Sequence, residues 1–391
     1  MKIVINAVSA KMGGAGTYID DLARECAKHL EHEFIWYIPE EREMAFRDAP
    51  SNFRIVTAPA GSLSFLRRFY WDQVTFRRFV KKIRPDLVYS TGNFAMLFCP
   101  AKQVLLVTQT VPFSGIWLRH VYPRKPFLSR IEIRLRRWLI CLSAWRADVV
   151  ITPTQAMLDD LRQFVKVDLR KTIINPFGVY APAETNAVGE RWKPAREGQH
   201  PDVIRLCYVS LYSEHKNVST LLRAISLLNA SGSTKFKLKT TADPGWAGAA
   251  WTATRKYDLK LAREPGIAEH VEFVGPLSRA QTQDLYRASD ILVFPSLTES
   301  FGFPMAEAMS YGLPMAAADT PVNREVCGEA AIYFSPLSAE DLAEQVQRVA
   351  SNAGLRARLA AAGRERAGSR FRWEIHAQHL MDAFVHNDAG I

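Results

Sequence analysis

The chain has 391 residues, of which 48% are hydrophobic and 23% charged, and it carries a net charge of +10. This length exceeds what a single hydrophobic core normally supports, and the composition excludes a disordered or low-complexity protein. The cysteines stand singly, without metal or redox spacing, which excludes a disulfide framework and fits buried thiols in a reducing compartment. They are Cys26, Cys99, Cys141, Cys207 and Cys327.

The start of the chain reaches glycines before a signal-peptide core can form. The longest uncharged apolar stretch, residues 138–145, is far shorter than the roughly 20 residues that span a bilayer. We therefore expect a cytoplasmic protein, with contact to the inner face of the plasma membrane left open.

Positive charge is concentrated in the first half of the chain. Residues 1–180 hold 27 Lys and Arg against 16 Asp and Glu, an excess of 11, whereas the remainder holds 23 against 24. Two halves with different partners are the simplest interpretation.

The first half alternates short apolar strands with helical stretches, the pattern of a parallel α/β sheet. A glycine-bearing loop at 13–16 precedes a helix that we expect to reach about residue 30, because Leu22, Cys26 and Leu30 recur at four-residue spacing. The predicted strands are 2–6, 34–38, 87–89, 104–108 and 149–152.

The apolar pattern lapses near residues 181–202, which we interpret as a linker, and then restarts as a second α/β half. Its predicted strands are 205–209, 236–240, 271–273, 290–294 and 314–317, and the chain is mostly helical from residue 339. Two such units predict a cleft between them, at the carboxyl ends of their strands.

The segment 291–312 carries the chemistry of the second half. An apolar strand leads into a loop with Glu299, and a helix predicted at 304–311 begins with Pro304 and contains Glu307. The helix N-terminus can hold an anion or sugar hydroxyls, and Glu299 can accept hydrogen bonds from hydroxyls. A plain strand–loop–helix with two solvated glutamates is the alternative.

The run Glu-Ser-Phe-Gly-Phe-Pro-x-x-Glu-Ala-Met-Ser-x-Gly-x-Pro, residues 299–314, resembles the E-x7-E signature of family-four retaining glycosyltransferases, which have the GT-B fold. The resemblance extends to 271–275, 285–290 and 328–336. It implies that Glu299 binds the donor sugar, that Ser300, Phe301 and Gly302 adjoin the sugar and phosphate, and that Glu307 holds the ribose.

A second family feature is a Gly-Arg-x-x-x-x-Lys segment after the first strand of the C-terminal half, whose two cations grip the diphosphate. Here the lysine is present as Lys216, whereas Leu211 stands in place of the arginine. Lys216 is a candidate phosphate clamp, because a cation near a leaving diphosphate stabilises its developing charge. A solvated loop lysine is the alternative, and the residue that replaces the arginine is not identified by the sequence.

Gly14 and Gly16 match the family's N-terminal Gly-Gly-x-Gly loop, where glycines let the backbone approach a phosphate or the acceptor. A plain tight turn is the alternative, and the dinucleotide fingerprint fails because Ile19 stands where a glycine is required.

Many family members carry a histidine where this chain has Gln109. Glutamine cannot shuttle a proton near neutral pH, which favours front-face return with the leaving phosphate as the base.

The resemblance thus gives one set of site residues and implies no cofactor. No metal ion is expected either, because the sequence lacks Asp-x-Asp, the motif that goes with a metal-bound diphosphate in the other glycosyltransferase fold. The expected catalytic residues are Glu299, Gln109 and Lys216. The expected donor-binding residues are Gly14, Gly16, Lys216, Glu299, Ser300, Phe301, Gly302 and Glu307.

Cations alternate with aromatic residues at 63–71, 76–82 and 130–138 in the first half. An anionic membrane surface is one partner that such a pattern fits. The alternative is a set of helices whose aromatics face the core while the arginines extend into solvent. Nucleic acid is disfavoured because no recognition motif accompanies the cations.

We therefore predict two Rossmann-like α/β domains facing across a cleft (GT-B). The acceptor-side domain is 1–180, the linker 181–202, the nucleotide-sugar domain 203–370, and a C-terminal helix in 371–391 returns to the first domain. The predicted activity is metal-independent, retaining transfer of a sugar from GDP-mannose or a UDP-hexose to a lipid-linked glycan of a lipopolysaccharide O-antigen, capsule or exopolysaccharide. The alternatives are a non-catalytic sugar-nucleotide-binding subunit and a GT-B epimerase.

Overall fold

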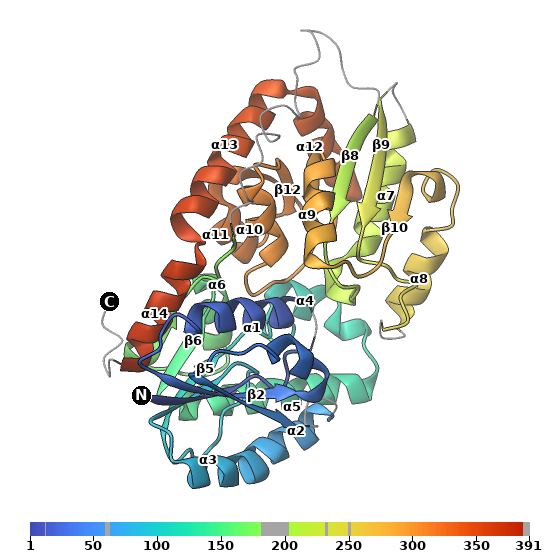
Figure 1. Ribbon diagram of the computed structural model, residues 1–391. Coiled ribbons are helices and arrows are strands. Elements are labelled where there is room, and N and C mark those ends of the chain that lie inside the picture. The colour runs from blue at the N-terminus through green and yellow to red at the C-terminus, as the bar shows by residue number, and fades with distance from the viewer. Residues whose placement is uncertain (12, 59–62, 181–202, 231–233, 249–251, 386–391) are drawn as a thin grey trace. The chain divides into compact units, whose positions relative to one another are not determined.

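The computed structural model describes the chain except residues 12, 59–62, 181–202, 231–233, 249–251 and 386–391 (Figure 1). The chain forms two compact units, one made of Met1–Gly178 with Trp373–Ile391 and the other of Val179–Arg372. The segment predicted as a linker, 181–202, lies outside the described residues.

The first unit contains a seven-stranded sheet in the order β3-β2-β1-β4-β5-β6-β7, and every pair of neighbouring strands is parallel. The central strands are buried along almost their whole length, as expected for a parallel sheet that is covered on both faces. The strands are β1 (Lys2–Asn6), β2 (Glu33–Pro39), β3 (Phe53–Ala58), β4 (Leu87–Ser90), β5 (Lys102–Leu106), β6 (Val149–Thr152) and β7 (Thr172–Ile174).

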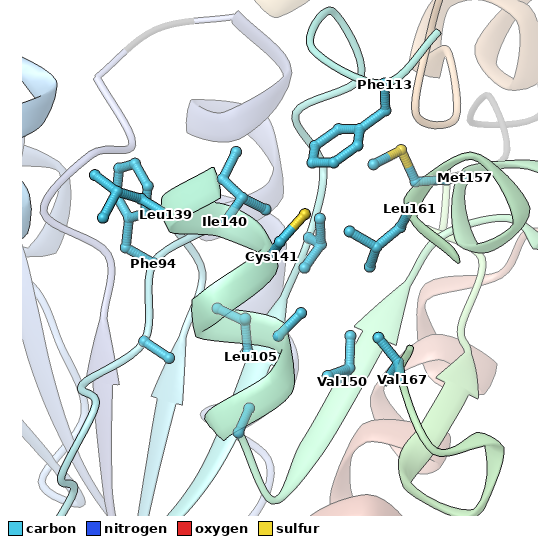
Figure 2. Packing of buried hydrophobic residues seen from close by; sticks show 14 residues of the cluster. Phe94, Leu105, Phe113, Leu139, Ile140, Cys141, Val150, Met157, Leu161 and Val167 are labelled. Carbon is cyan, nitrogen blue, oxygen red and sulfur yellow. The ribbon is translucent and has the colours of Figure 1, made fainter. Parts of the chain in front are cut away.

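Helices cover this sheet and supply its core. Leu139, Ile140 and Cys141 of the long helix α5 lie in one cluster with Leu105 of β5 and Val150 of β6 (Figure 2). The helices of the unit are α1 (Gly13–Cys26), α2 (Phe65–Trp71), α3 (Arg77–Ile83), α4 (Gly115–His120), α5 (Phe127–Arg146), α6 (Gln155–Arg162) and α14 (Trp373–Val385).

Two expectations for the first unit were wrong, and two of its strands were missed. Gly13–Gly16 is the first turn of α1 and not a loop, and α1 ends at Cys26 because Leu30 is exposed and adds nothing to its apolar face. The strands β3 and β7 were not predicted. They are the two edge strands of the sheet and only partly buried, so their apolar signal is weak.

The second unit contains a six-stranded parallel sheet in the order β10-β9-β8-β11-β12-β13. Its strands are β8 (Val203–Tyr208), β9 (Lys235–Thr240), β10 (Val271–Phe273), β11 (Ile291–Phe294), β12 (Met315–Ala318) and β13 (Ala331–Phe334). Its helices are α7 (Val218–Ala230), α8 (Ala253–Leu261), α9 (Arg279–Ala288), α10 (Phe303–Ser310), α11 (Pro321–Cys327), α12 (Ala339–Ser351) and α13 (Ala353–Arg370).

The last helix, α14, packs into the first unit beside α1. A Cβ atom on Gly178 would lie 2.4 Å from the Trp373 backbone, so only glycine permits this approach. On the other side of the unit boundary, Val179 N–H donates to the Phe371 carbonyl at 2.7 Å. The chain therefore leaves and re-enters the first unit at adjacent points.

A buried polar chain fixes α14. His376 Nδ1 lies 2.9 Å from the Pro176 carbonyl, His376 Nε2 lies 3.2 Å from the Tyr18 hydroxyl, and that hydroxyl lies 2.6 Å from the Tyr89 hydroxyl. A carbonyl only accepts hydrogen bonds, so Nδ1 carries the proton, Nε2 accepts from Tyr18, and Tyr18 accepts from Tyr89. Burial lowers the pKa of His376 to about 4, so the ring is neutral at pH 7.

This pKa predicts a pH-dependent loss of stability. As the pH falls below about 6.5, the unfolded chain binds a proton at His376 before the folded chain does, so the contribution of this group is present above 6.5 and lost toward 4. At pH 5.5 the loss is about 1 kcal/mol, or roughly 2–4 °C in melting temperature for a unit of this size. Melting curves at pH 7.5 and 5.5 should therefore differ less for His376→Gln than for the wild type. Equal differences would contradict the assignment.

Candidate active site

The order of the strands reverses between β8 and β11 in the second unit, since β9 and β10 follow on one side and β12 and β13 on the other. Ligands of open α/β sheets bind at the carboxyl ends of the strands at such a reversal. The loop after β8, which ends at Asn217, and the loop after β11, which ends at Gly302, both begin there.

An ion pair joins these two loops. Lys216 Nζ donates to Glu299 Oε1 at 2.5 Å, and the two side chains are 15% and 13% exposed. Charged side chains that are this far removed from water are costly unless they are paired. The structure therefore brings together two of the residues that the sequence predicts to be catalytic.

The backbone of the two loops is held by further contacts. Leu297 N–H donates to the His215 carbonyl at 2.8 Å, and the buried Tyr208 hydroxyl lies 3.1 Å from the Lys216 carbonyl and 3.0 Å from Ser296 Oγ. These contacts hold the two loops together beside the ion pair.

Asn217 completes this frame from an uncommon backbone conformation. Its φ is 54°, in the left-handed region, and its Nδ2 donates to the Pro295 carbonyl at 3.1 Å and the Pro336 carbonyl at 2.6 Å. Asparagine tolerates this region better than most residues. It thus ties the ends of three strands together directly after the lysine.

The neighbouring His215 is neutral. Desolvation by burial, reinforced by the Lys216 charge, holds the pKa of His215 well below its ordinary value. Its ring contacts Ser213 Oγ at 3.1 Å, and its carbonyl receives the Leu297 hydrogen bond. Through its ring and its carbonyl, His215 therefore helps to fix the loop after β8.

The helix after Glu299 begins one residue earlier than predicted. Helix α10 spans Phe303–Ser310, so Pro304 is its second residue and not its first. Gly302 caps the helix with a φ of 85°, and a Cβ at this position would lie 2.5 Å from Met305 Cε. A side chain at Gly302 would therefore be strained and crowded. Phe301 is buried against Phe303 and Phe371, so only its backbone can face a ligand.

Glu307 lies in the second turn of α10 and is half-buried. The hydroxyl of the buried Tyr286, on α9, donates to Glu307 Oε2 at 2.8 Å. The pKa of Tyr286 is raised well above its ordinary value by burial and then by the Glu307 charge, so this hydroxyl remains a donor. Sequence reasoning missed Tyr286, although its place in the Leu-Tyr-Arg-Ala-Ser-Asp segment, 285–290, could have drawn attention to it.

The position where the family arginine is replaced is anchored toward α8. Tyr212, which follows Leu211, is buried, and its hydroxyl donates to Asp258 Oδ2 at 2.8 Å. Desolvation raises the pKa of Asp258 to about 6. These contacts do not place another cation where the family has its arginine.

The remaining predicted residues belong to the first unit. Gln109 follows β5, and Asn93 Oδ1 accepts from the N–H groups of Thr108 and Gln109 at 2.6 and 2.8 Å. Gly14 and Gly16 lie in the first turn of α1, and a Cβ on Gly16 would lie 2.8 Å from Arg42 Nη1. Among the residues described in either unit, no group of three His, Cys, Asp or Glu side chains is placed to hold a metal ion.

Two family models match the chain. The model described as Glycosyltransferase Family 4 matches residues 12–181, and the model described as Glycosyl transferases group 1 matches residues 191–366. A D-inositol 3-phosphate glycosyltransferase of Stackebrandtia nassauensis is 27% identical over 244 residues, which are 61% of this chain and 54% of the relative. The match thus spans about half the length of this curated relative.

Solved structures share the fold over nearly the whole chain. WaaG, a glycosyltransferase involved in lipopolysaccharide biosynthesis, is 17% identical with a TM-score of 0.73, covering 98% of this chain and 100% of its own. Anabaena HepE in complex with UDP-glucose is 17% identical with a TM-score of 0.71, covering 98% of both chains. With the two parallel sheets and the two matched family models, these likenesses show that the chain belongs to the family-four glycosyltransferases and has the GT-B fold.

Proposed function

We propose that the chain is a retaining, metal-independent glycosyltransferase that moves a sugar from a nucleotide-diphosphate sugar to a lipid-linked glycan. The Lys216–Glu299 ion pair at the strand reversal is the observation that carries this proposal. The pair supplies a cation for a diphosphate and a carboxylate for sugar hydroxyls, on two loops that the backbone contacts hold together.

In this proposal Lys216 stabilises the leaving group. A lysine ammonium has three donors, so it can retain its hydrogen bond to Glu299 while another N–H contacts a phosphate oxygen. Negative charge grows on that oxygen as the bond from the anomeric carbon to the diphosphate breaks, and a fixed cation lowers the barrier. The N-terminus of α10 adds the positive end of its dipole.

The acceptor side of the reaction is assigned to the first unit. We propose that Gln109 orients the reacting groups by hydrogen bonds, because its amide does not titrate near neutral pH. The acceptor hydroxyl then loses its proton to the departing phosphate oxygen on the same face, and the new glycosidic bond forms on that face with retention. Gly14 and Gly16, at the start of α1, are proposed to adjoin the donor or acceptor phosphate.

The donor is proposed to be a UDP-hexose or GDP-mannose, since HepE is solved with UDP-glucose. The acceptor is proposed to be a lipid-linked glycan in the assembly of a lipopolysaccharide O-antigen, capsule or exopolysaccharide, in keeping with the involvement of WaaG in lipopolysaccharide biosynthesis. The proposed location is the cytoplasm, at the inner face of the plasma membrane.

A non-catalytic sugar-nucleotide-binding subunit is a second candidate. Gln109 and Leu211 favour it, because they replace a histidine and an arginine of the family pattern. The intact pair of Lys216 and Glu299 favours the enzyme. A donor that binds but is neither hydrolysed nor transferred to membrane lipid extracts would favour the subunit.

Replacing Glu307 should impair donor binding. We expect Glu307→Ala to lower kcat/KM by about 10–100-fold, mainly through a higher KM, because charge-assisted hydrogen bonds to the ribose are lost. Steady-state kinetics with the best donor measure this effect. Glu307→Gln is the matched control for folding, since its amide oxygen can still accept from Tyr286, which Glu307→Ala leaves buried without this acceptor. Wild-type kinetics in both variants would remove Glu307 from the donor site.

Chelation should leave the reaction almost unchanged. The leaving-group charge is assigned to Lys216 and the N-terminus of α10, so excess EDTA should not alter the initial rate. Rates are compared before and after EDTA and again after Mg²⁺ or Mn²⁺ is restored. Loss of activity that is recovered only by a divalent ion would contradict the metal-free reaction.

A thermal-shift screen should identify the donor. A ligand that binds only the folded state, present at 100 times its Kd, stabilises that state by about 2.7 kcal/mol, or roughly 5–10 °C here. UDP-glucose, UDP-galactose and GDP-mannose are compared with the free nucleotides at equal concentration. If no sugar nucleotide at millimolar concentration raises the melting temperature, the donor assignment fails.

A further inference from the structure

The long helix α5 has an apolar side that faces away from its core. Successive residues of an α-helix turn by about 100°, which places Phe127, Ile131, Trp138 and Trp145 within about 40° of one another. Of the five buried residues of α5, Leu139, Ile140, Ser143 and Ala144 fall on the opposite side, whereas Cys141 lies beside the outward side chains. The four outward side chains are 67%, 44%, 58% and 55% exposed, respectively. We call them the outward stripe.

An ordinary amphipathic helix turns a polar side toward water, whereas α5 has an apolar side in the core and also carries this outward stripe. The sequence left open whether the aromatic residue at the end of 130–138 faces the core. Trp138 is exposed and does not pack into the core. Exposed aromatic and aliphatic side chains that gather on one face of a globular unit point to an interaction site.

Cations flank the outward stripe. Arg130, Arg134 and Arg137 lie along one side of it, and α5 carries five arginines against one acidic residue, Glu132. Arg134 and Arg137 also lie over aromatic rings, at 5.8 Å from the centre of Tyr122 and 4.2 Å from that of Phe164. The stripe therefore combines aromatic and aliphatic side chains with a local positive charge.

The neighbouring helix α2 repeats this pattern. Phe65 and Phe69 pack against the cluster that contains Leu139 and Ile140, whereas Leu66 and Tyr70 point away from it and are exposed. The Arg136 guanidinium of α5 lies 4.6 Å from the centre of the Phe65 ring, so the two helices are in contact. Two helices that are separate in the sequence thus present apolar side chains outside one core.

We propose that the outward stripe docks the first unit onto an anionic membrane surface. Tryptophan, tyrosine and phenylalanine side chains enter the boundary between headgroups and acyl chains, while neighbouring arginines pair with anionic headgroups. Among the residues that the structure describes, no helix has the length and apolarity needed to cross a bilayer.

A second copy of the chain fits this surface less well than anionic lipid does. A two-fold interface brings the same patch of both subunits together, so the arginines beside the stripe would meet their own copies, with only Glu132 of α5 to pair with them. Charge therefore favours an anionic partner.

The docking does not depend on the transfer reaction, so it can be tested without a donor or an acceptor.

Vesicle co-sedimentation at low salt tests the proposal. The wild type should bind vesicles containing phosphatidylglycerol and should bind pure phosphatidylcholine weakly. The double variant Ile131→Ser/Trp138→Ser should bind the anionic vesicles at least about ten-fold more weakly, because two exposed apolar side chains no longer insert. The control, Leu337→Ser, removes an exposed apolar residue of the second unit and should bind like the wild type.

The arginines are tested separately. Arg134→Gln should weaken binding about five-fold at low salt, and this difference should shrink as salt is added. Arg358→Gln, an exposed arginine of α13 in the second unit, is its control. All variants replace exposed side chains, and unchanged melting temperatures establish that they are folded.

Fluorescence shows whether the stripe itself enters the lipid. Brominated acyl chains should quench the wild type more than Trp138→Phe, which keeps an aromatic ring and should still bind. Failure of the wild type to bind anionic vesicles, or equal binding by the double variant, would overturn the proposal. A dimer in sedimentation velocity that the double variant abolishes, without vesicle binding by the wild type, would assign the stripe to a second copy.

Discussion

The parallel pairing of strands is the constraint on which the rest of this structure depends. Each connection in a parallel sheet must return to the end where the strand began, so it crosses a face of the sheet and covers it. All carboxyl ends then lie at one edge. In the second unit this edge collects the loops after β8 and β11, because those strands are neighbours although more than 80 residues of chain separate them.

The ion pair at this edge illustrates why a site needs a rigid frame. Two mostly buried charges stabilise each other only in good geometry, and their desolvation offsets much of the attraction. Asn217, Tyr208 and the hydrogen bond from Leu297 to His215 fix the main chain around the pair. Tyr286 instead holds the Glu307 carboxylate directly through its hydroxyl. Residues that contact no ligand in the proposed reaction thus place the residues that do.

The sequence predicted what depends on local pattern and failed where tertiary contacts decide. Two α/β halves and most central strands follow from apolar runs, and Glu299 and Lys216 were predicted as site residues from their motifs. The edge strands β3 and β7 were missed because partial burial weakens their pattern. Tyr286 and Asn217 act through partners far along the chain, which spacing cannot reveal. The outward orientation of Trp138 could be learned only from the structure, because an aromatic residue among arginines can face either the core or the solvent.

The contact between Gly178 and Trp373 has a further consequence for how this molecule is organised. The second unit is one continuous segment whose two ends are adjacent, so it has the form of a domain inserted into a host. The host is made of two segments that meet where the insert leaves it. A short bridge from Gly178 to Trp373 would therefore close the host into a single chain, and the insert could be produced alone from one uninterrupted coding segment.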